Sequence, residues 1–242
     1  MVMEANRDES AEQLADPVPT AEPVPTADPV PTAEEVLERL RKSRPGLSFR
    51  EVMTGLVTMG ATDPVTGYGD DAAVAMRLYA AVAIPNLPAF FTDPIHKGRW
   101  RASGSIPVLG GAICGEDDGD FGLFRRAIHA EKGVRELVYD TEIAVGGHRY
   151  RMRGRKFVEP SPPWRVWQAT TTLYVQLFPV SGGHQPVAAG VLRLSLSAFI
   201  RQLFSMRVTG DFWLGDKFRY LLSFYRFFVS SLVNTYIKGR RW

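Results

Sequence analysis

The sequence predicts a mainly β protein, either an antiparallel calycin/lipocalin-like barrel or a strongly curved sheet, with helices flanking it at the N- and C-terminal ends. Between Ala72 and Leu196, apolar residues recur at every second position, which is the period of a half-buried strand. Glycine-rich turns interrupt these segments, as they do between the strands of successive hairpins. Because a sheet of this size can close around an apolar interior, the interior is where we look for a function.

The composition of the 242-residue chain favours one folded β domain with a core of its own. Hydrophobic residues make up 45% of the chain and charged residues 23%. The net charge of +3 is too small to indicate a protein that binds DNA or RNA, so we expect no nucleic-acid partner.

The single cysteine, Cys114, excludes an intrachain disulfide and fits a reducing compartment. The N-terminus lacks the apolar run of a secretory signal, and no apolar stretch is long enough for a spanning helix, so we expect a cytoplasmic protein.

A short repeat precedes the predicted barrel. The unit Ala-Asp/Glu-Pro-Val-Pro-Thr begins at residues 15, 21 and 27. Its prolines forbid helix and remove sheet donors, so residues 1–32 are expected to form a disordered, extended tail. This tail is either a spacer or a docking segment for a proline-recognising partner. Residues 33–44 are expected to form a short helix, because Thr32 and Glu35 make a capping box and Pro45 ends the pattern.

Residues 49–210 are expected to form the barrel, with about eight strands. The clearest alternation runs over residues 74–84, and Pro85 ends it. Gly146-Gly147 is the strongest hairpin signal in the chain and joins residues 137–145 to a return strand. A short helix is expected within residues 87–96. The other expected strands are residues 49–58, 101–113, 121–128, 170–178 and 187–196.

Two helices are expected after the last strand. Residues 197–207 place Phe199, Leu203 and Met206 on one side of a helix. Residues 211–242 form an amphipathic C-terminal segment, in which residues 217–237 repeat apolar side chains at helical spacing. The members of that stripe are Phe218, Leu221, Leu222, Tyr225, Val229, Leu232 and Tyr236. This helix is expected to pack on the barrel, and the alternative is a position in a membrane interface with Trp242 at headgroup level.

No motif in the sequence indicates a metal or a cofactor. The four histidines have no ligand spacing among themselves, so we expect no metal site. The glycines of residues 110–115 do not have the spacing of a dinucleotide fingerprint, and we expect no cofactor. Cys114 has no histidine near it in sequence, and a Gly-x-Ser-x-Gly elbow is missing. Catalytic residues therefore stay unassigned, and the sequence leaves open whether the protein is an enzyme.

Four arginines occupy one face of the strand that follows Gly147. Arg149, Arg151, Arg153 and Arg155 alternate with less polar residues, so this face is expected to be the solvated outside of the sheet. The alternatives are a contact surface for an anionic partner and a rim that holds a ligand carboxylate.

Five residues are the predicted ligand-binding residues. Thr170, Thr172 and Tyr174 would form an inward stripe that gives a cavity both apolar surface and hydrogen bonds, although threonine is also simply a good strand former. His96 ends a short apolar segment and is expected either to line the pocket or to lie in a solvated loop. Tyr68 completes the set.

Several short strings resemble an accessory domain appended to some bacterial flavoproteins of the glucose-methanol-choline type, those related to sterol oxidases. The resemblance covers residues 49–236, and the domain would here occur alone. The flavin-binding motif of those enzymes is missing, so their oxidase activity does not carry over and no catalytic residue is transferred. The resemblance implies an association with hydrophobic or lipid-like substrates. The strings that carry it are Phe49-Arg50-Glu51-Val52-Met53-Thr54-Gly55, Thr62-Asp63-Pro64, Gly67-Tyr68, Arg151-Met152-Arg153-Gly154-Arg155-Lys156, Val166-Trp167, Thr170-Thr171-Thr172-Leu173-Tyr174, Gln202-Leu203, Met206-Arg207 and Thr209-Gly210.

These observations predict a binding or accessory protein for an apolar small molecule such as a lipid, a sterol or a polyketide-like intermediate. One alternative is a cofactor-independent isomerase or cyclase of a biosynthetic pathway, which would act by holding a flexible substrate in a reactive shape. Another is a peripheral membrane or scaffold protein that uses the last helix and the basic strand.

Overall fold

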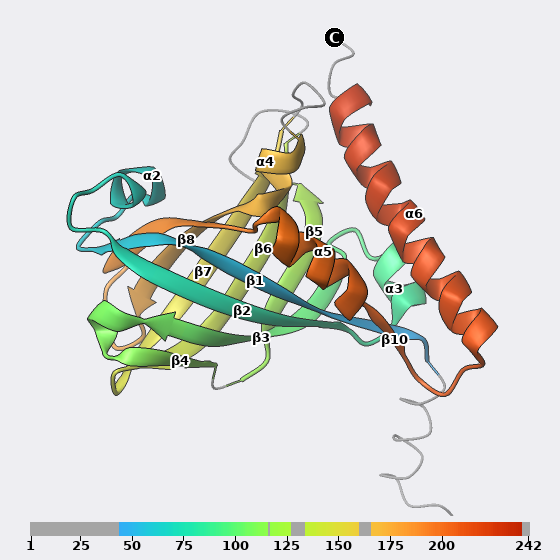
Figure 1. Cartoon of the computed structure of the whole chain (residues 1–242), viewed down its shortest axis with the longest axis horizontal. Helices are drawn as coiled ribbons and strands as arrows, with labels where there is room; N and C mark the ends of the chain where they lie inside the picture. The colour runs from blue at the N-terminus through green and yellow to red at the C-terminus, as the bar shows by residue number, and fades with distance from the viewer. Residues whose placement is uncertain (1–43, 116, 127–133, 160–165, 239–242) are drawn as a thin grey trace, which may run out of the picture.

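The computed structural model describes residues 44–115, 117–126, 134–159 and 166–238 (Figure 1). The expected proline-rich tail and nearly all of the expected helix over residues 33–44 lie outside these ranges. Within them the chain is mainly β and forms a closed antiparallel barrel with a C-terminal helix, so the predicted fold class is confirmed.

The described residues contain ten strands, which form one continuous antiparallel sheet. Most consecutive strands pair with each other, and the last long strand pairs with the first, which closes the barrel. The strands are β1 (Gly46–Met59), β2 (Val74–Ile84), β3 (Lys97–Ile106), β4 (Gly111–Gly115), β5 (Gly119–Arg126), β6 (Arg135–Val145), β7 (His148–Val158), β8 (Thr172–Pro179), β9 (Ala188–Arg193) and β10 (Arg207–Thr209).

Strands β4 and β5 share one position in the barrel wall. β4 pairs with one end of β3 and β6, and β5 pairs with the other end of the same two strands. The short β10 pairs only with the start of β1 and lies outside the ring. The wall therefore has eight positions, a number at which side chains can fill the interior.

Glycines allow β1 and β9 to close the barrel. Gly55 lies opposite Leu192, and Gly190 lies opposite Val57. A Cβ atom at Gly55 would overlap the carbonyl oxygen of Val191, and one at Gly190 would overlap that of Leu56. The two backbones can approach this closely only because neither glycine carries a side chain.

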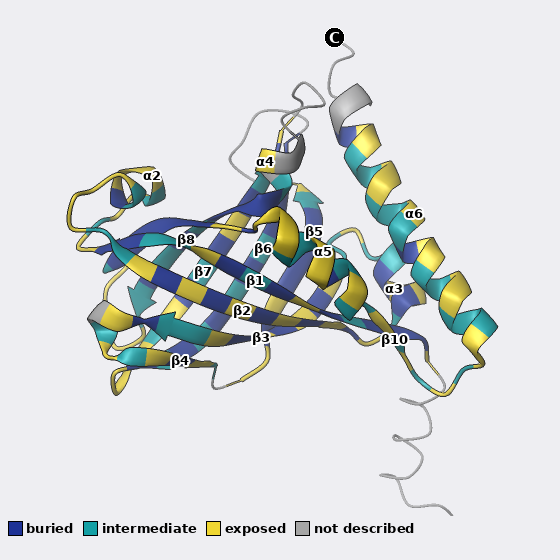
Figure 2. Cartoon of the chain, viewed as in Figure 1, coloured by how far each residue is buried: buried dark blue, intermediate teal, exposed yellow. Residues whose placement is uncertain are grey.

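Side chains that alternate inward from the strands fill most of the barrel. Figure 2 shows buried and exposed residues taking turns along β1 and β2. The rings of Trp100 and Tyr139 meet edge to face at 5.3 Å, and Phe121 packs on the same tyrosine at 5.2 Å. The middle of the barrel is thus a packed core.

Six helical segments of the described residues lie around the barrel, and two of them cover one end. They are α2 (Pro64–Tyr68), α3 (Leu87–Thr92), η1 (Pro107–Leu109), α4 (Val166–Thr171), α5 (Leu196–Ser205) and α6 (Leu214–Lys238). Ser195 caps α5 by accepting a hydrogen bond from the backbone of Ala198. Helix α5 lies against β1, and α6 lies beside α3 at the end opposite α2 (Figure 1). Within the described ranges, the helices lack the combination of length and apolar character that crossing a bilayer requires.

The structure corrects two details of the sequence-based expectations. The strand expected over residues 170–178 begins at Thr172, because α4 takes up residues 166–171. The apolar stripe expected to pack α6 on the barrel is correct only in part, because Leu221 and Leu232 pack against the core but other members do not. Phe218, Leu222 and Val229 are exposed, whereas Phe224 is buried. The helix is apolar around much of its girth, so periodicity alone does not determine which side faces the barrel.

Candidate functional site

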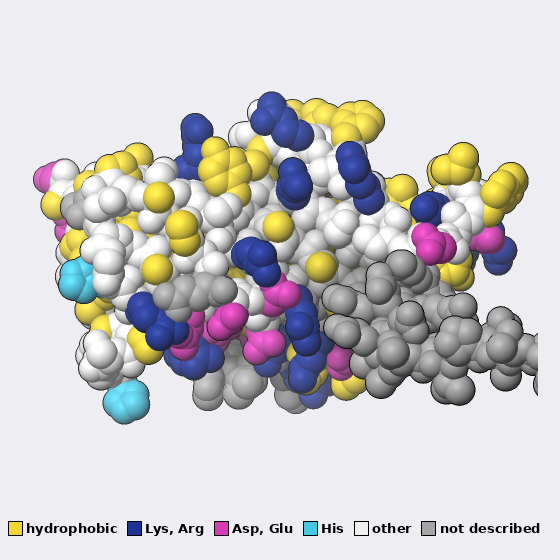
Figure 3. Space-filling model, turned by 90° about the horizontal axis from the view of Figure 1, so that it is seen from below, with side chains coloured by type: hydrophobic (Ala, Val, Ile, Leu, Met, Phe, Trp, Pro, Cys, Tyr) yellow, Lys and Arg dark blue, Asp and Glu magenta, His cyan; other side chains and the backbone are white. Residues whose placement is uncertain are grey.

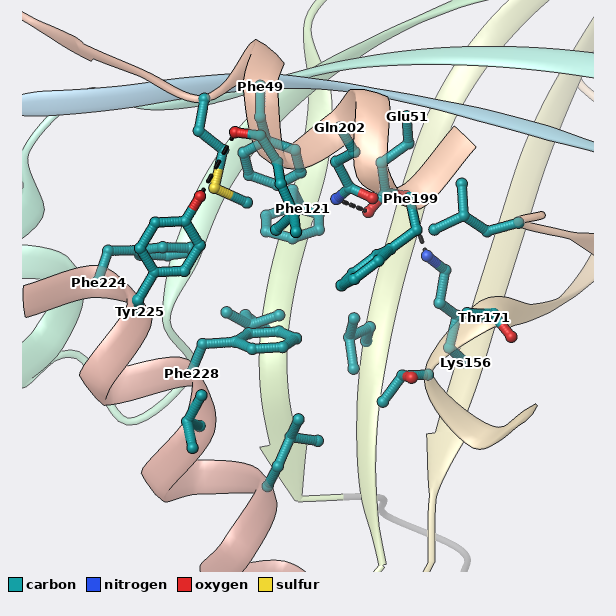
Figure 4. Close-up of a pocket in the computed structure, with 18 residues that line it drawn as sticks. Phe49, Glu51, Phe121, Lys156, Thr171, Phe199, Gln202, Phe224, Tyr225 and Phe228 are labelled. Carbon is teal, nitrogen blue, oxygen red and sulfur yellow. Dashed lines mark hydrogen bonds and ion pairs between the residues drawn. The ribbon is translucent and has the colours of Figure 1, made fainter. Parts of the chain in front are cut away.

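A cavity of about 540 Å³ lies at the end of the barrel that α5 and α6 cover (Figure 4). Its wall combines the beginning of β1, parts of β5 and β6, the end of β7, and side chains from α4 and from the two covering helices. Backbone hydrogen bonds between strands fix one side of the cavity. The helices that form the other side are held in place by contacts between side chains.

The lining is predominantly apolar and aromatic. Phe49 from β1 and Phe121 from β5 meet edge to face at 6.2 Å. Phe199 contributes from α5, and Phe224 and Phe228 contribute from α6. Rings of this kind offer a large contact area to an apolar ligand.

Three polar residues of this lining, Glu51, Lys156 and Gln202, join the buried Tyr139 in one hydrogen-bonded group, which we call the polar cluster. Glu51 accepts from Tyr139 Oη and from Lys156 Nζ, both at 2.9 Å from Oε2. Its Oε1 accepts from Gln202 Nε2 at 2.7 Å. Glu51, Lys156 and Gln202 line the cavity, and Figure 4 shows them converging along one wall.

The strand period explains why two charges lie inside. Glu51 lies on the inward face of β1 between Phe49 and Met53. Lys156 lies on the inward face of β7 with Met152, although its neighbour Arg155 points out to solvent. Charged residues at inward positions are rare unless they are paired, as these two are.

Burial and charge both act on Tyr139. This side chain is fully buried, and burial, followed by the nearby charge of Glu51, raises the pKa of its phenol well above the ordinary value of 10.0. It therefore stays protonated and donates to Glu51. The ammonium of Lys156 also lies 5.3 Å from the centre of the tyrosine ring, a cation–π distance.

Gln202 has one polar atom, its amide oxygen, for which the described part of the chain offers no partner. Its side chain is 7% exposed, and its Oε1 has no hydrogen-bond partner among the described residues. Buried acceptors of this kind are uncommon in folded proteins and require a physical explanation. Thr172 Oγ1 is the other such atom, but Thr172 does not line the cavity.

One of the five predicted ligand-binding residues lines the cavity. Thr170 does so, but from α4 rather than from a strand. The expected inward stripe on β8 is wrong by one residue. Leu173 and Val175 point inward, and Tyr174 lies outside beside Arg153 and Phe157. Successive side chains on a strand point to opposite faces. Thr172 is two positions from Tyr174 and therefore lies on the same outer face.

Tyr68 and His96 also lie away from the cavity. Tyr68 ends α2 at the opposite end of the barrel, where the guanidinium of Arg193 covers its ring at 5.0 Å. The Nδ1 of His96 lies 2.7 Å from the carbonyl oxygen of Phe90, and its ring contacts Phe227 of α6 at 4.8 Å. The structure therefore does not bring the predicted set together.

The arginine face of β7 is the outside of the barrel, as expected. Arg149 pairs with Glu142, and both Arg151 and Arg153 approach Asp140. These side chains are about half exposed, so the face is a solvated network of ion pairs.

Sequence reasoning missed Glu51, Lys156 and Gln202. A signal existed for the first two, because each charge stands at a position where the strand period predicts an apolar residue. In contrast, Gln202 joins them only through the docking of α5, which no local pattern specifies. In the described part of the chain, His, Cys, Asp and Glu side chains form no group of three that could hold a metal ion.

Comparison with known proteins gives no match to a family model, a curated protein or a solved structure.

Proposed function

We propose that this protein binds an apolar small molecule, such as a lipid or a polyketide-like intermediate, in the cavity at the end of its barrel. The observation that carries this proposal is the composition of that cavity. It offers about 540 Å³ of space, with an aromatic and aliphatic lining and a few polar side chains gathered on one wall. Ligand sites in proteins typically enclose about 300–1,000 Å³ and combine an apolar lining with a few polar groups that orient the ligand.

The covering helices supply a route for entry. Hydrogen bonds join the strands of the wall on both sides, whereas α6 is joined to α5 by one long contact from Tyr225 Oη to the carbonyl oxygen of Leu203, at 3.4 Å. In the part of the chain that the structure describes, the rest of α6 is held mainly by apolar packing, such as that of Leu232 on the core and of the Phe227 ring on Phe90 at 5.7 Å. Separating the helices costs less than opening the sheet, so we expect the ligand to pass between them.

The resemblance to the accessory domain of sterol-oxidase-like flavoproteins supports the same class of ligand. That resemblance includes the strings that contain Glu51, Lys156 and Gln202, which are the polar residues of the cavity wall.

Mass spectrometry of the purified full-length chain tests the proposal. We expect organic extraction to release one apolar compound, or a small related group, that is missing from a mock purification. We also expect apolar probes to raise the melting temperature, because a ligand that binds only the folded state stabilises it. The proposal fails if nothing is released and no apolar probe changes the melting temperature.

Exposed apolar side chains on the covering helices support a second candidate function, contact with a lipid bilayer. Leu196, Ile200 and Phe204 form an exposed stripe on α5, and the exposed Trp213 and Leu214 mark the start of α6. Figure 3 shows hydrophobic, basic and acidic side chains together at the end of the molecule where α6 begins. Residues 201–235 contain five basic and two acidic residues, a balance that favours an anionic surface.

Vesicle flotation tests this second candidate. The substitutions Phe204→Ser and Trp213→Ser should reduce recovery with vesicles that contain phosphatidylserine. Val65→Ser is the matched control, because Val65 is similarly exposed but lies on α2 at the other end of the barrel. Equal flotation of all variants, or no flotation of the unmodified protein, would rule out bilayer contact through this surface.

A further inference from the structure

Gln202 lines the cavity, and its hydrogen bonds identify which of its two amide atoms lacks a partner. A carboxylate only accepts, so the side-chain atom that meets Glu51 Oε1 at 2.7 Å has to be the amide nitrogen. The amide oxygen, Gln202 Oε1, is therefore the acceptor that lacks a partner among the described residues. Because this oxygen is buried, a ligand that donates to it would add a hydrogen bond that the described residues do not supply.

The charges of the cavity wall disfavour an ionised headgroup. Lys156 and Glu51 form a contact of 2.9 Å, and both side chains are almost completely buried. A ligand carboxylate would compete with Glu51 for Lys156 and would bring a second negative charge beside it. A ligand ammonium would face Lys156 in the same way. Either ion would also lose its hydration on entering the cavity.

Resting on the proposed function, we propose that the ligand of this cavity carries an uncharged hydroxyl group at one end of an apolar body, and that this hydroxyl donates a hydrogen bond to Gln202 Oε1. An ether, ester or ketone oxygen can only accept, so it would leave the Gln202 oxygen unsatisfied. Figure 4 shows Gln202 and Phe228 on different sides of the cavity, so the apolar body extends from the polar cluster towards α6.

A chain-matched series of probes tests this inference on the full-length protein. The probes are dodecan-1-ol, its methyl ether, dodecanoate and dodecylammonium, and binding is measured by displacement of the uncharged fluorophore N-phenyl-1-naphthylamine. We expect the alcohol to bind about tenfold or more tightly than the methyl ether, which keeps the oxygen but lacks the donor. We expect both ions to bind more weakly than the alcohol.

The substitution Gln202→Met removes the acceptor at similar volume. It should reduce the preference for the alcohol over the ether to within about twofold, whereas Gln176→Met should retain the preference. Gln176 lies on the outer face of β8 and bonds to the backbone of Thr62, so it is a matched control. If Gln202→Met fails to fold, the comparison of alcohol with ether on the unmodified protein still decides.

The outcomes separate this inference from the proposed function. Equal binding of the alcohol and the ether, or tightest binding of an ion, overturns the hydroxyl inference and leaves the apolar cavity as a binding site. Displacement of the fluorophore by none of the four probes overturns both.

Discussion

Nζ of Lys156 lies 2.9 Å from Oε2 of Glu51, and the two side chains remain only 1% and 6% exposed although they come from strands far apart in the sequence. This contact connects β7 to β1 at the wall of the cavity. Removing two ions from water is costly, and only a well-placed partner compensates for that cost. The stability of the barrel end should therefore depend on the pair being kept or removed as a unit.

The substitution Glu51→Leu should destabilise the protein by about 3–5 kcal/mol, because it leaves the Lys156 charge buried without a partner. The double substitution Glu51→Leu with Lys156→Met should recover most of that loss, since both ions are then gone. Urea denaturation of the single and double variants measures the two free energies of unfolding. A double variant that is no more stable than Glu51→Leu would show that Lys156 does not depend on Glu51.

Tyr139 should make stability sensitive to alkaline pH. Its pKa is raised in the folded state, by burial first and by the charge of Glu51 second. Its contribution is therefore fully present below the unfolded pKa of about 10 and is lost as pH rises above that value, because the unfolded chain then releases a proton that the folded chain keeps.

The substitution Tyr139→Phe removes this titration. Between pH 10 and pH 11, the free energy of unfolding should fall less steeply in Tyr139→Phe than in the unmodified protein, by up to about 1.4 kcal/mol per pH unit. The other titrating groups are common to both proteins, so the difference isolates Tyr139. Parallel curves would show that the phenol ionises as easily in the folded state as in the unfolded chain.

Gly190 should tolerate no side chain at the seam between β1 and β9. An added Cβ would overlap the backbone of Leu56 and Val57, so Gly190→Ala should cost about 1–3 kcal/mol. Gly69→Ala is the matched control, because the nearest atom to its added Cβ would be the carbonyl oxygen of Val65 at 3.7 Å. Thermal unfolding of both variants compares the sites, and equal melting temperatures would contradict the close approach at the seam.

Arg151 should contribute little to stability even though it makes two hydrogen bonds to Asp140. Its side chain is half exposed, so water and salt screen the pair, and Arg153 approaches the same carboxylate. Arg151→Ala should lower the free energy of unfolding by less than about 1 kcal/mol in urea denaturation. A loss as large as that of Glu51→Leu would mean that this face is not the solvated exterior.

The period of two predicted much of the barrel, since the expected strand over residues 74–84 coincides with β2 and the Gly146-Gly147 turn joins β6 to β7. The same period did not place Tyr174 correctly. Threonine and tyrosine are common on both faces of a strand, so they did not indicate which side chains of β8 point inward. The aliphatic residues Leu173 and Val175 point inward, and their positions would have predicted the inner face of β8 correctly.

The candidate site was less predictable than the fold. Glu51 and Lys156 each broke an apolar face, but their pairing joins residues 105 positions apart. Gln202 reaches the cavity only because α5 docks across the barrel end. Apolar residues such as Phe218 are exposed on α6, so an apolar stripe on a helix does not by itself predict which side of the helix packs on the barrel.

The central claim, that an apolar ligand occupies the cavity beneath α6, is tested most directly by filling that cavity. Leu232 lines it, whereas the adjacent Val233 is exposed and does not. We predict that Leu232→Trp weakens the binding of N-phenyl-1-naphthylamine by about tenfold or more, and that Val233→Trp leaves its dissociation constant within about twofold of the unmodified protein. Equal dissociation constants for two folded variants would show that the fluorophore binds elsewhere and would contradict the account.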